Sequence, residues 1–230
     1  MSAVTGIEWT DHTFNPWIGC SRVSVACAEC YAFGQWAQRY RPGQAVDLWR
    51  RNGARHVTSA GYWRQPLTWE RQAAAPGRTA RVLCASLADV FEDRRDLDEP
   101  RARLWELIAA TPHLAWQLLT KRPEHVTSMV PWGDDWPANV WLGVSAESQR
   151  WAGQRIPALT AIPARVRFVS AEPLTEDVML PLEGIDWVIL GGMSGPKWQR
   201  HRLEPGWARS VRDQCQAAGV AFFFKQWGGP

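Results

Sequence analysis

Three cysteines near the N-terminus are the residues of this sequence whose type and spacing most directly suggest chemistry. They are Cys20, Cys27 and Cys30, in the pattern C-x6-C-x2-C. Clustered thiolates bind zinc or iron–sulfur clusters, and a C-x2-C pair at the start of a helix supplies two of them. A structural zinc site needs a fourth ligand, whereas a cluster held by three cysteines leaves one iron free for a substrate or cofactor. The spacing therefore predicts a metal or iron–sulfur site.

The other cysteines and the hydropathy indicate the compartment. Cys84 lies in an apolar run and Cys215 in a candidate helix, so we expect both to be structural. An odd count of five, with three clustered, favours metal or redox chemistry over disulfides. No apolar run approaches the roughly 20 residues of a membrane span, and residues 1–11 do not resemble a signal peptide. We expect a soluble, cytoplasmic protein with no membrane contact.

The composition suits one globular domain. A chain of 230 residues with 46% hydrophobic content can build one large core, and we predict a single domain over residues 1–230. The net charge of +3 does not establish nucleic-acid binding. Lysine occurs only at 121, 197 and 225, so the positions of these cations are informative. Sixteen tryptophans are enough for some to line a pocket that stacks on flat rings.

Short apolar runs alternate with helical patterns from residue 80 onward. The runs cover residues 81–86, 115–120, 140–145, 166–170, 187–192 and 220–225. Candidate helices cover residues 31–39, 99–111 and 207–218, the last ending before Gly219. Together with a first strand around residues 17–19, this alternation predicts an α/β protein with a mostly parallel sheet, as a partial or closed (β/α) TIM-like barrel. Residues 43–78 show no clear pattern, and we expect an irregular excursion there.

Polar residues follow these apolar runs. In parallel β/α folds the carboxyl ends of the strands form the active-site mouth, which the cysteine segment would share. The candidate cofactor-binding residues at these ends are Ser86, Asp89, Ser145, Glu147, Ser170, Gly191, Gly192 and Ser194. The candidate catalytic residues are Lys121, Glu172 and Lys225.

Each of these positions also has a structural interpretation. Asp89 and Glu172 could be helix caps or partners of arginines. The glycines from Gly191 onward could form a plain turn, or a backbone cradle for a carboxylate, ribose or phosphate. Lys121 and Arg122 could cap a helix or face solvent, but two lysines at strand ends favour an anionic ligand.

Several longer motifs carry a family resemblance that runs nearly end to end. They occupy residues 7–11, 15–20, 27–32, 118–123, 139–145, 170–174, 185–195 and 222–229. With these motifs the chain resembles a phage and prophage family of unknown function that is described as radical-SAM-like. Members of that family often neighbour a three-Cys-motif partner protein.

The resemblance implies a partial TIM barrel with a 4Fe–4S cluster on Cys20, Cys27 and Cys30. S-adenosylmethionine would bind the fourth iron, and an electron from an external donor would cleave it to methionine and a 5′-deoxyadenosyl radical. The phage association implies a nucleotide or nucleic-acid substrate. The usual radical-SAM loop is C-x3-C-x2-C, so the first gap of six residues here is a departure.

Two other functions fit the residues. A zinc module that interacts with nucleic acid would complete tetrahedral coordination with His12, Cys84 or Cys215. A hydrolase would use Glu147 and Glu172 as paired carboxylates, but it leaves the cysteine spacing unexplained.

Overall fold

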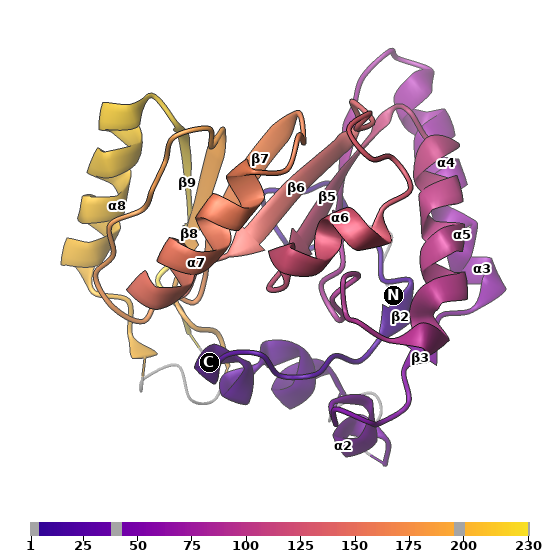
Figure 1. Ribbon diagram of the computed structural model, residues 1–230, viewed down its shortest axis with the longest axis horizontal. Helices are drawn as coiled ribbons and strands as arrows, with labels where there is room; N and C mark the ends of the chain where they lie inside the picture. Colours follow the sequence, from indigo (N-terminus) through magenta and orange to yellow (C-terminus); the bar gives the residue numbers. More distant parts are fainter. Residues whose placement is uncertain (1–4, 38–42, 196–200, 230) are drawn as a thin grey trace.

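The chain is organised around a seven-stranded parallel sheet that curls into a half-barrel (Figure 1). The computed structural model describes residues 5–37, 43–195 and 201–229. The sheet has the order β1-β4-β5-β6-β7-β8-β9, and each strand pairs in parallel with its neighbours. Its strands are β1 (His12–Thr13), β4 (Ala80–Cys84), β5 (Leu114–Thr120), β6 (Val140–Ser145), β7 (Val166–Ala171), β8 (Trp187–Gly191) and β9 (Ala221–Gln226). This topology confirms the predicted α/β partial barrel.

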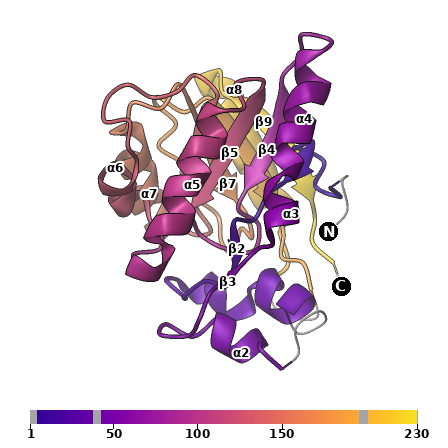
Figure 2. The same ribbon diagram turned by 90° about the vertical axis from the view of Figure 1, so that its right-hand side faces the viewer.

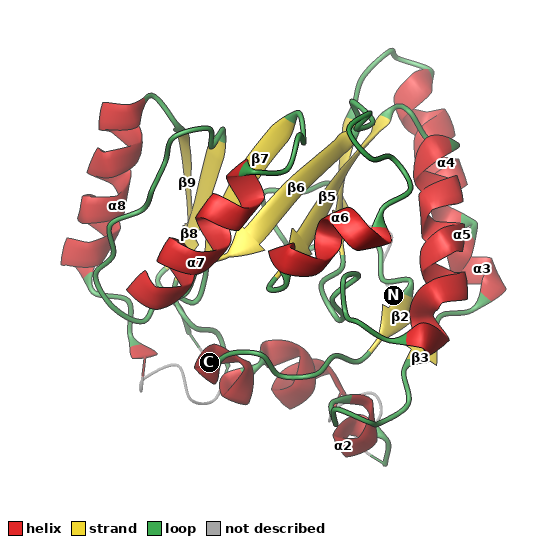
Figure 3. Cartoon of the chain, in the orientation of Figure 1, coloured by secondary structure: helices red, strands yellow, loops and turns green. Residues whose placement is uncertain are grey.

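Helices cover the outer face of this sheet (Figure 3). They include α3 (Ala60–Trp63), α4 (Gln65–Ala74), α5 (Asp98–Ala109), α6 (Val126–Met129), α7 (Gln149–Thr160) and α8 (Pro205–Ala218). The predicted helices over residues 99–111 and 207–218 are confirmed as α5 and α8. Helix α8 ends at Gly219, whose φ of 67° is the left-handed conformation that glycine adopts readily.

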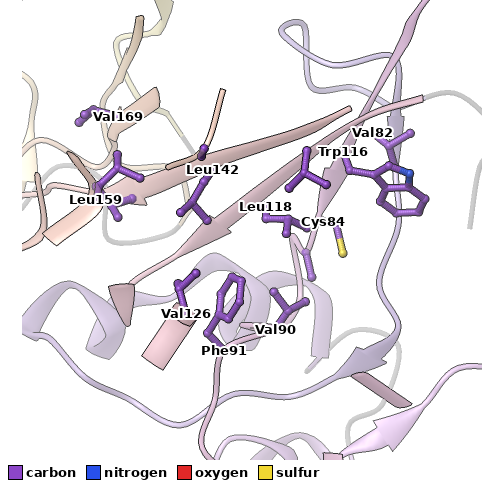
Figure 4. Close-up of a cluster of buried hydrophobic side chains, with 14 of the residues drawn as sticks. Val82, Cys84, Val90, Phe91, Trp116, Leu118, Val126, Leu142, Leu159 and Val169 are labelled. Atoms are coloured by element: carbon purple, nitrogen blue, oxygen red, sulfur yellow. The ribbon is translucent and has the colours of Figure 1, made fainter. Parts of the chain in front are cut away.

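The main core lies between the sheet and these helices (Figure 4). Trp116, Leu118 and Leu142 project from β5 and β6 into it and are fully buried. The indole of Trp116 donates a hydrogen bond to Thr111 Oγ1 at 2.9 Å, which satisfies its one polar group. Because both faces of the sheet are covered, the strands read as continuous apolar runs, which explains why the sequence revealed them.

A second cluster fills the inner, concave face of the sheet. It contains Trp9, Leu83, Phe168 and Ile189, all buried. Gly143 on β6 faces Phe168, and a Cβ at that position would lie 2.4 Å from the phenyl ring. The absence of a side chain at Gly143 therefore creates the space that the Phe168 ring fills.

The prediction that residues 17–19 form the first strand of the barrel is wrong. Trp17–Ile18 forms β2, which pairs antiparallel with β3 (His56–Val57) in a separate two-stranded sheet. The first strand of the main sheet is β1, which has only two residues, one of them the polar His12. An apolar dipeptide such as Trp17–Ile18 looks like a barrel strand because both of its side chains are buried, as those of a barrel strand would be.

The expectation of an irregular excursion over residues 43–78 is also wrong. This stretch contains α2 (Ala45–Leu48), β3, α3 and α4. Helix α4 has a weak apolar pattern because its buried residues are few: Pro66, Trp69 and Ala73. The helix expected over residues 31–39 is a π-helix, η2 (Ala32–Ala37), and residues 38 and 39 lie outside the described ranges.

The cysteine segment and α2 form a layer below one end of the sheet (Figures 1 and 2). The strand arrows in Figure 1 point towards this layer, so it lies across the carboxyl ends of the strands. Within the described ranges, none of the helices has the length and apolar character needed to cross a membrane.

Candidate active site at the carboxyl ends of the strands

The three cysteines lie in one segment that begins directly after β2. Cys20 follows Gly19, which has a φ of 112° and packs so closely that a Cβ would lie 2.4 Å from the Leu48 carbonyl oxygen. Cys27 lies in the 3-10 helix η1 (Val25–Glu29), and Cys30 is the residue that ends it. All three thiols are free and half-buried. The tight turn at Gly19 therefore directs the chain from the two-stranded β2–β3 sheet across the carboxyl ends of the barrel strands.

The three cysteines and the strand ends line one cavity of about 380 Å³. Its volume is in the range of small-molecule sites. The strand-end residues that line it are Ser86, Asp89, Lys121, Arg122, Ser145, Ser170, Glu172, Gly192, Ser194 and Lys225. Two candidates, Glu147 and Gly191, lie outside this lining. The structure thus brings the cysteines and most of the predicted site residues to the same place.

The surroundings of the thiols differ. Burial raises the pKa of Cys20 to about 12, although Arg122 opposes this. Burial also raises the pKa of Cys30, against the opposing backbone N–H groups of Phe33 and Ala32. For Cys27, burial alone would raise the pKa, but hydrogen bonding from Ser24 and its neighbouring backbone brings it below the usual value. Cys27 is therefore the thiol that ionises most readily in the metal-free protein.

Lys121 belongs to a buried cluster of charges. Its Nζ donates to Glu147 Oε2 at 3.2 Å, and Arg155 Nη1 donates to the same oxygen at 2.7 Å. Burial alone would raise the pKa of Glu147, but the two cations hold it below its usual value. Glu147 therefore acts from behind the cavity wall, by fixing Lys121, which itself lines the cavity.

A second ion pair lies at the end of β9. Lys225 Nζ donates to Glu172 Oε1 at 2.5 Å, and both side chains remain partly exposed. The same carboxyl group packs against Gly191, where a Cβ would lie 3.0 Å from it. Gly191 thus makes room for Glu172, which explains why Gly191 is absent from the cavity lining.

The glycine-rich segment after β8 packs against the chain after β9. A Cβ on Gly192 would lie 2.2 Å from the Trp227 carbonyl oxygen, so the two backbones approach very closely. Ser194 Oγ accepts a hydrogen bond from Gln226 Nε2. The segment is therefore fixed before any ligand binds, and Gly192 and Ser194 line the cavity.

Asp89 lines the cavity, but its carboxylate is held within the protein. It accepts hydrogen bonds from Thr120 Oγ1 at 2.8 Å, from the Lys121 backbone N–H at 3.1 Å and from Arg122 Nη1 at 2.7 Å. Its partnership with an arginine matches the structural interpretation that the sequence left open. Ser86 Oγ likewise pairs with the side chain of Asn15 at 3.1 Å.

Several cavity residues were not predicted. They are Ile7, Trp9, Arg22, Tyr31, Leu83, Leu119 and Met193. Tyr31 directly follows the third cysteine, so its position beside the site was a usable signal. The apolar residues belong to the inner face of the barrel or to the N-terminal segment that covers it. No local pattern separates them from ordinary core residues.

The positions of the cysteines also bear on the two alternative functions. Among the residues that the structure describes, no three His, Cys, Asp or Glu side chains are grouped so that they could hold one metal ion. Cys84 and Cys215 are fully buried in the core, and the ring of His12 stacks on Trp69 with centroids 4.3 Å apart. The tetrahedral zinc alternative therefore has no support in this geometry. The hydrolase alternative has none either, because both of its carboxylates must reach the substrate and only Glu172 lines the cavity.

An iron–sulfur cluster fits the residues better. Its irons are separate atoms, so its cysteine ligands need not meet on one point. The three free thiols line one cavity and have Lys121 and Arg122 beside them, and these cations offset the negative charge of thiolate ligands. The donor set is thus chemically suited to a cluster.

The fold has solved counterparts. A cysteine-to-serine mutant of spore photoproduct lyase superposes with a TM-score of 0.55 at 13% identity, covering 93% of this chain and 63% of that structure. A double mutant of spore photoproduct lyase with bound AdoMet and dinucleoside spore photoproduct gives a TM-score of 0.50 at 12% identity, covering 90% of this chain and 61% of that structure. The chain spans about three fifths of these longer proteins. It therefore shares their α/β half-barrel fold.

The chain belongs to the family described as "Protein of unknown function (DUF5131)", which matches residues 4–230. Among curated proteins, none matches this sequence.

Proposed function

We propose that this protein is an iron–sulfur enzyme of the radical-SAM type. Cys20, Cys27 and Cys30 would hold a 4Fe–4S cluster, and S-adenosylmethionine would bind at the adjoining strand ends. The observation that carries the proposal is the cavity that the three free cysteines share with the strand-end polar residues. The half-barrel fold, shared with a spore photoproduct lyase structure that contains AdoMet, supports it.

The cluster and S-adenosylmethionine together would supply one-electron reductive cleavage of the sulfonium, with the electron coming from an external donor, to give a 5′-deoxyadenosyl radical that abstracts a substrate hydrogen. The protein's residues position the ligands and exclude water. Lys121 and Lys225 present cations that suit a carboxylate, and Glu172 presents an acceptor for an amino group. Ser145 and Ser170, side by side on β6 and β7, offer hydroxyls to a ribose.

The apolar part of the cavity serves the same chemistry. Trp9, Leu83 and Leu119 line it from the inner face of the sheet and keep water away. An apolar lining on this side of the cavity would help to protect a reactive radical from side reactions, which is what a hydrogen-abstracting enzyme requires.

We propose a nucleotide or nucleic-acid component as the substrate. The double mutant of spore photoproduct lyase that resembles this chain has a bound dinucleoside spore photoproduct, which supports a substrate of that class. A three-Cys-motif protein remains the proposed partner on the family resemblance.

Anaerobic reconstitution with iron and sulfide tests the proposal. The wild-type protein should become brown, with about four irons per chain, and single substitutions Cys20→Ala, Cys27→Ala and Cys30→Ala should abolish the colour. Cys215→Ala is the matched control, because Cys215 is a free cysteine buried in α8 away from the cavity. Addition of S-adenosylmethionine and dithionite should then release 5′-deoxyadenosine. A colourless protein that binds one zinc ion would contradict the proposal.

A further inference from the structure

Arg122 donates hydrogen bonds to the chain at the first cysteine. Its Nη1 donates to Cys20 Sγ at 3.6 Å, and its Nη2 donates to the carbonyl oxygen of Ser21 at 2.7 Å and to Ser21 Oγ at 2.9 Å. The Arg122 side chain is only 5% exposed. One planar guanidinium therefore holds two consecutive residues of the cysteine segment from the end of β5.

Asp89 fixes the direction of this guanidinium. It accepts from Arg122 Nη1 at 2.7 Å and is itself held by Thr120 and by the backbone N–H of Phe91 at 3.1 Å. Because Asp89 comes from the segment after β4 and Thr120 ends β5, two adjacent strands of the barrel set the orientation of Arg122. The Asp89 carboxylate balances the charge of the Arg122 guanidinium, which is therefore held towards Cys20 Sγ without help from solvent.

A second set of hydrogen bonds also holds Ser21. The Ser21 backbone N–H donates to Glu92 Oε1 at 3.0 Å. Arg55 in turn binds both oxygens of Glu92, at 2.9 and 2.7 Å, and donates to the Leu48 carbonyl oxygen at 3.0 Å. Ser21 is thus fixed at its amide by Glu92 and at its carbonyl group by Arg122.

We propose that Arg122 is a positioning residue for the cluster ligand Cys20, and that its N–H···S contact raises the reduction potential of the bound cluster. The role rests on the proposed function. A hydrogen bond and a positive charge at a ligand sulfur stabilise the more negative, reduced form of a cluster, and hydrogen bonds to the sulfurs are a known determinant of potential. Lysine cannot replace this contact, because a single ammonium cannot reach Asp89, Cys20 and Ser21 as the two guanidinium nitrogens do.

Two variants separate the geometry from the charge. Arg122→Lys keeps the positive charge but loses the pair of guanidinium nitrogens that donate together, and Arg122→Gln loses both. Arg167→Lys is the control, because Arg167 donates to the carbonyl oxygen of Ile162 at the amino end of β7, away from the cavity and from the residues that hold Ser21. Circular dichroism spectra should establish that each variant is folded.

Hydrogen–deuterium exchange on the metal-free proteins tests positioning. Exchange of peptides covering residues 18–24 should accelerate by about tenfold or more in both Arg122 variants, since hydrogen bonds to a charged group are lost. Arg167→Lys should leave this segment at the wild-type rate. Wild-type exchange of residues 18–24 in Arg122→Gln would overturn the positioning role.

Redox titration of the reconstituted proteins with dithionite and mediator dyes tests the effect on potential. The potential should be most negative in Arg122→Gln, intermediate in Arg122→Lys and unchanged in Arg167→Lys. Equal potentials in Arg122→Gln and wild type would overturn this part of the proposal. A wild-type protein that takes up no iron would refute the proposed function, and the exchange result would still decide whether Arg122 positions the cysteine segment.

Discussion

Gly143 offers a sharp test of how the inner face of the barrel is packed. In Gly143→Ala, the new Cβ would lie 2.4 Å from Cε2 and Cζ of Phe168. Carbon atoms in contact are separated by about 3.5–4.0 Å, so the ring would have to move by about 1 Å. Phe168 is fully buried against Trp9 and Trp187, with centroids 6.2 and 6.0 Å away, so its displacement would disturb the packing of both rings.

The expected cost is that of overpacking, about 1–3 kcal/mol. For a chain of this size, each kcal/mol shifts the melting temperature by about 2–4 °C, so Tm should fall by roughly 2–12 °C. Urea and thermal unfolding followed by tryptophan fluorescence measure both quantities.

A matched control and a rescue make the reasoning refutable. Gly153 lies exposed in α7, and a Cβ added there would meet no atom within 4 Å, so Gly153→Ala should stabilise the protein by about 0.5–1 kcal/mol. Phe168→Leu should cost less in the Gly143→Ala background than in wild type, because the smaller side chain removes the clash. A Gly143→Ala variant as stable as wild type, or a double variant with strictly additive costs, would refute this description of the inner face.

Three further predictions concern the site. Because Lys121 and Arg155 hold the pKa of Glu147 below its usual value, its contribution to stability is complete above the usual carboxylate pKa and is lost as the pH falls. The metal-free Glu147→Gln variant should therefore lose less stability than wild type between about pH 6 and pH 3 in urea unfolding, and an identical loss would contradict this. Tyr31→Phe removes the hydrogen bond from the phenol to the Ser86 carbonyl oxygen at 2.5 Å and should cost about 0.5–1.5 kcal/mol of unfolding free energy, a prediction that fails if the midpoint stays unchanged. Lys225→Gln should weaken binding of S-adenosylmethionine to the reconstituted protein by about tenfold or more in calorimetry, and undiminished affinity would remove Lys225 from the binding site.

The sequence predicted the sheet well where burial of the strands made their residues uniformly apolar. Strands β4 to β8 are runs of apolar residues because helices cover one face and the inner cluster covers the other, whereas the phenylalanines of β9 pack against both clusters and stay only partly buried. It failed at β1, since two residues carry no periodicity, and at Trp17, whose apolar character does not say which sheet receives it. The segment over residues 43–78 was missed because most of its elements have four or fewer residues, too few repeats to show a period.

The site residues, too, could be predicted from the sequence only in part. The strand-end rule brought residues such as Lys121, Ser145 and Lys225 to one cavity because parallel strands share one carboxyl end. Sequence could not separate residues that line the cavity from Glu147, which supports Lys121 from behind. It also could not pair Arg55 with Glu92, since their contact depends on how the cysteine segment folds over the sheet.

The pairing of β1 with β4 has a consequence for how the protein is assembled. Strands β4 to β9 each pair with the next strand in the sequence, whereas β1 joins β4 across a long connection, as the hydrogen bond between Asp11 and Arg81, 70 residues apart, illustrates. Long connections slow folding because loop closure costs entropy before contacts form. We therefore expect β4–β9 to form first and the cysteine-bearing segment to close last, so that the proposed cluster would be inserted into a largely completed barrel.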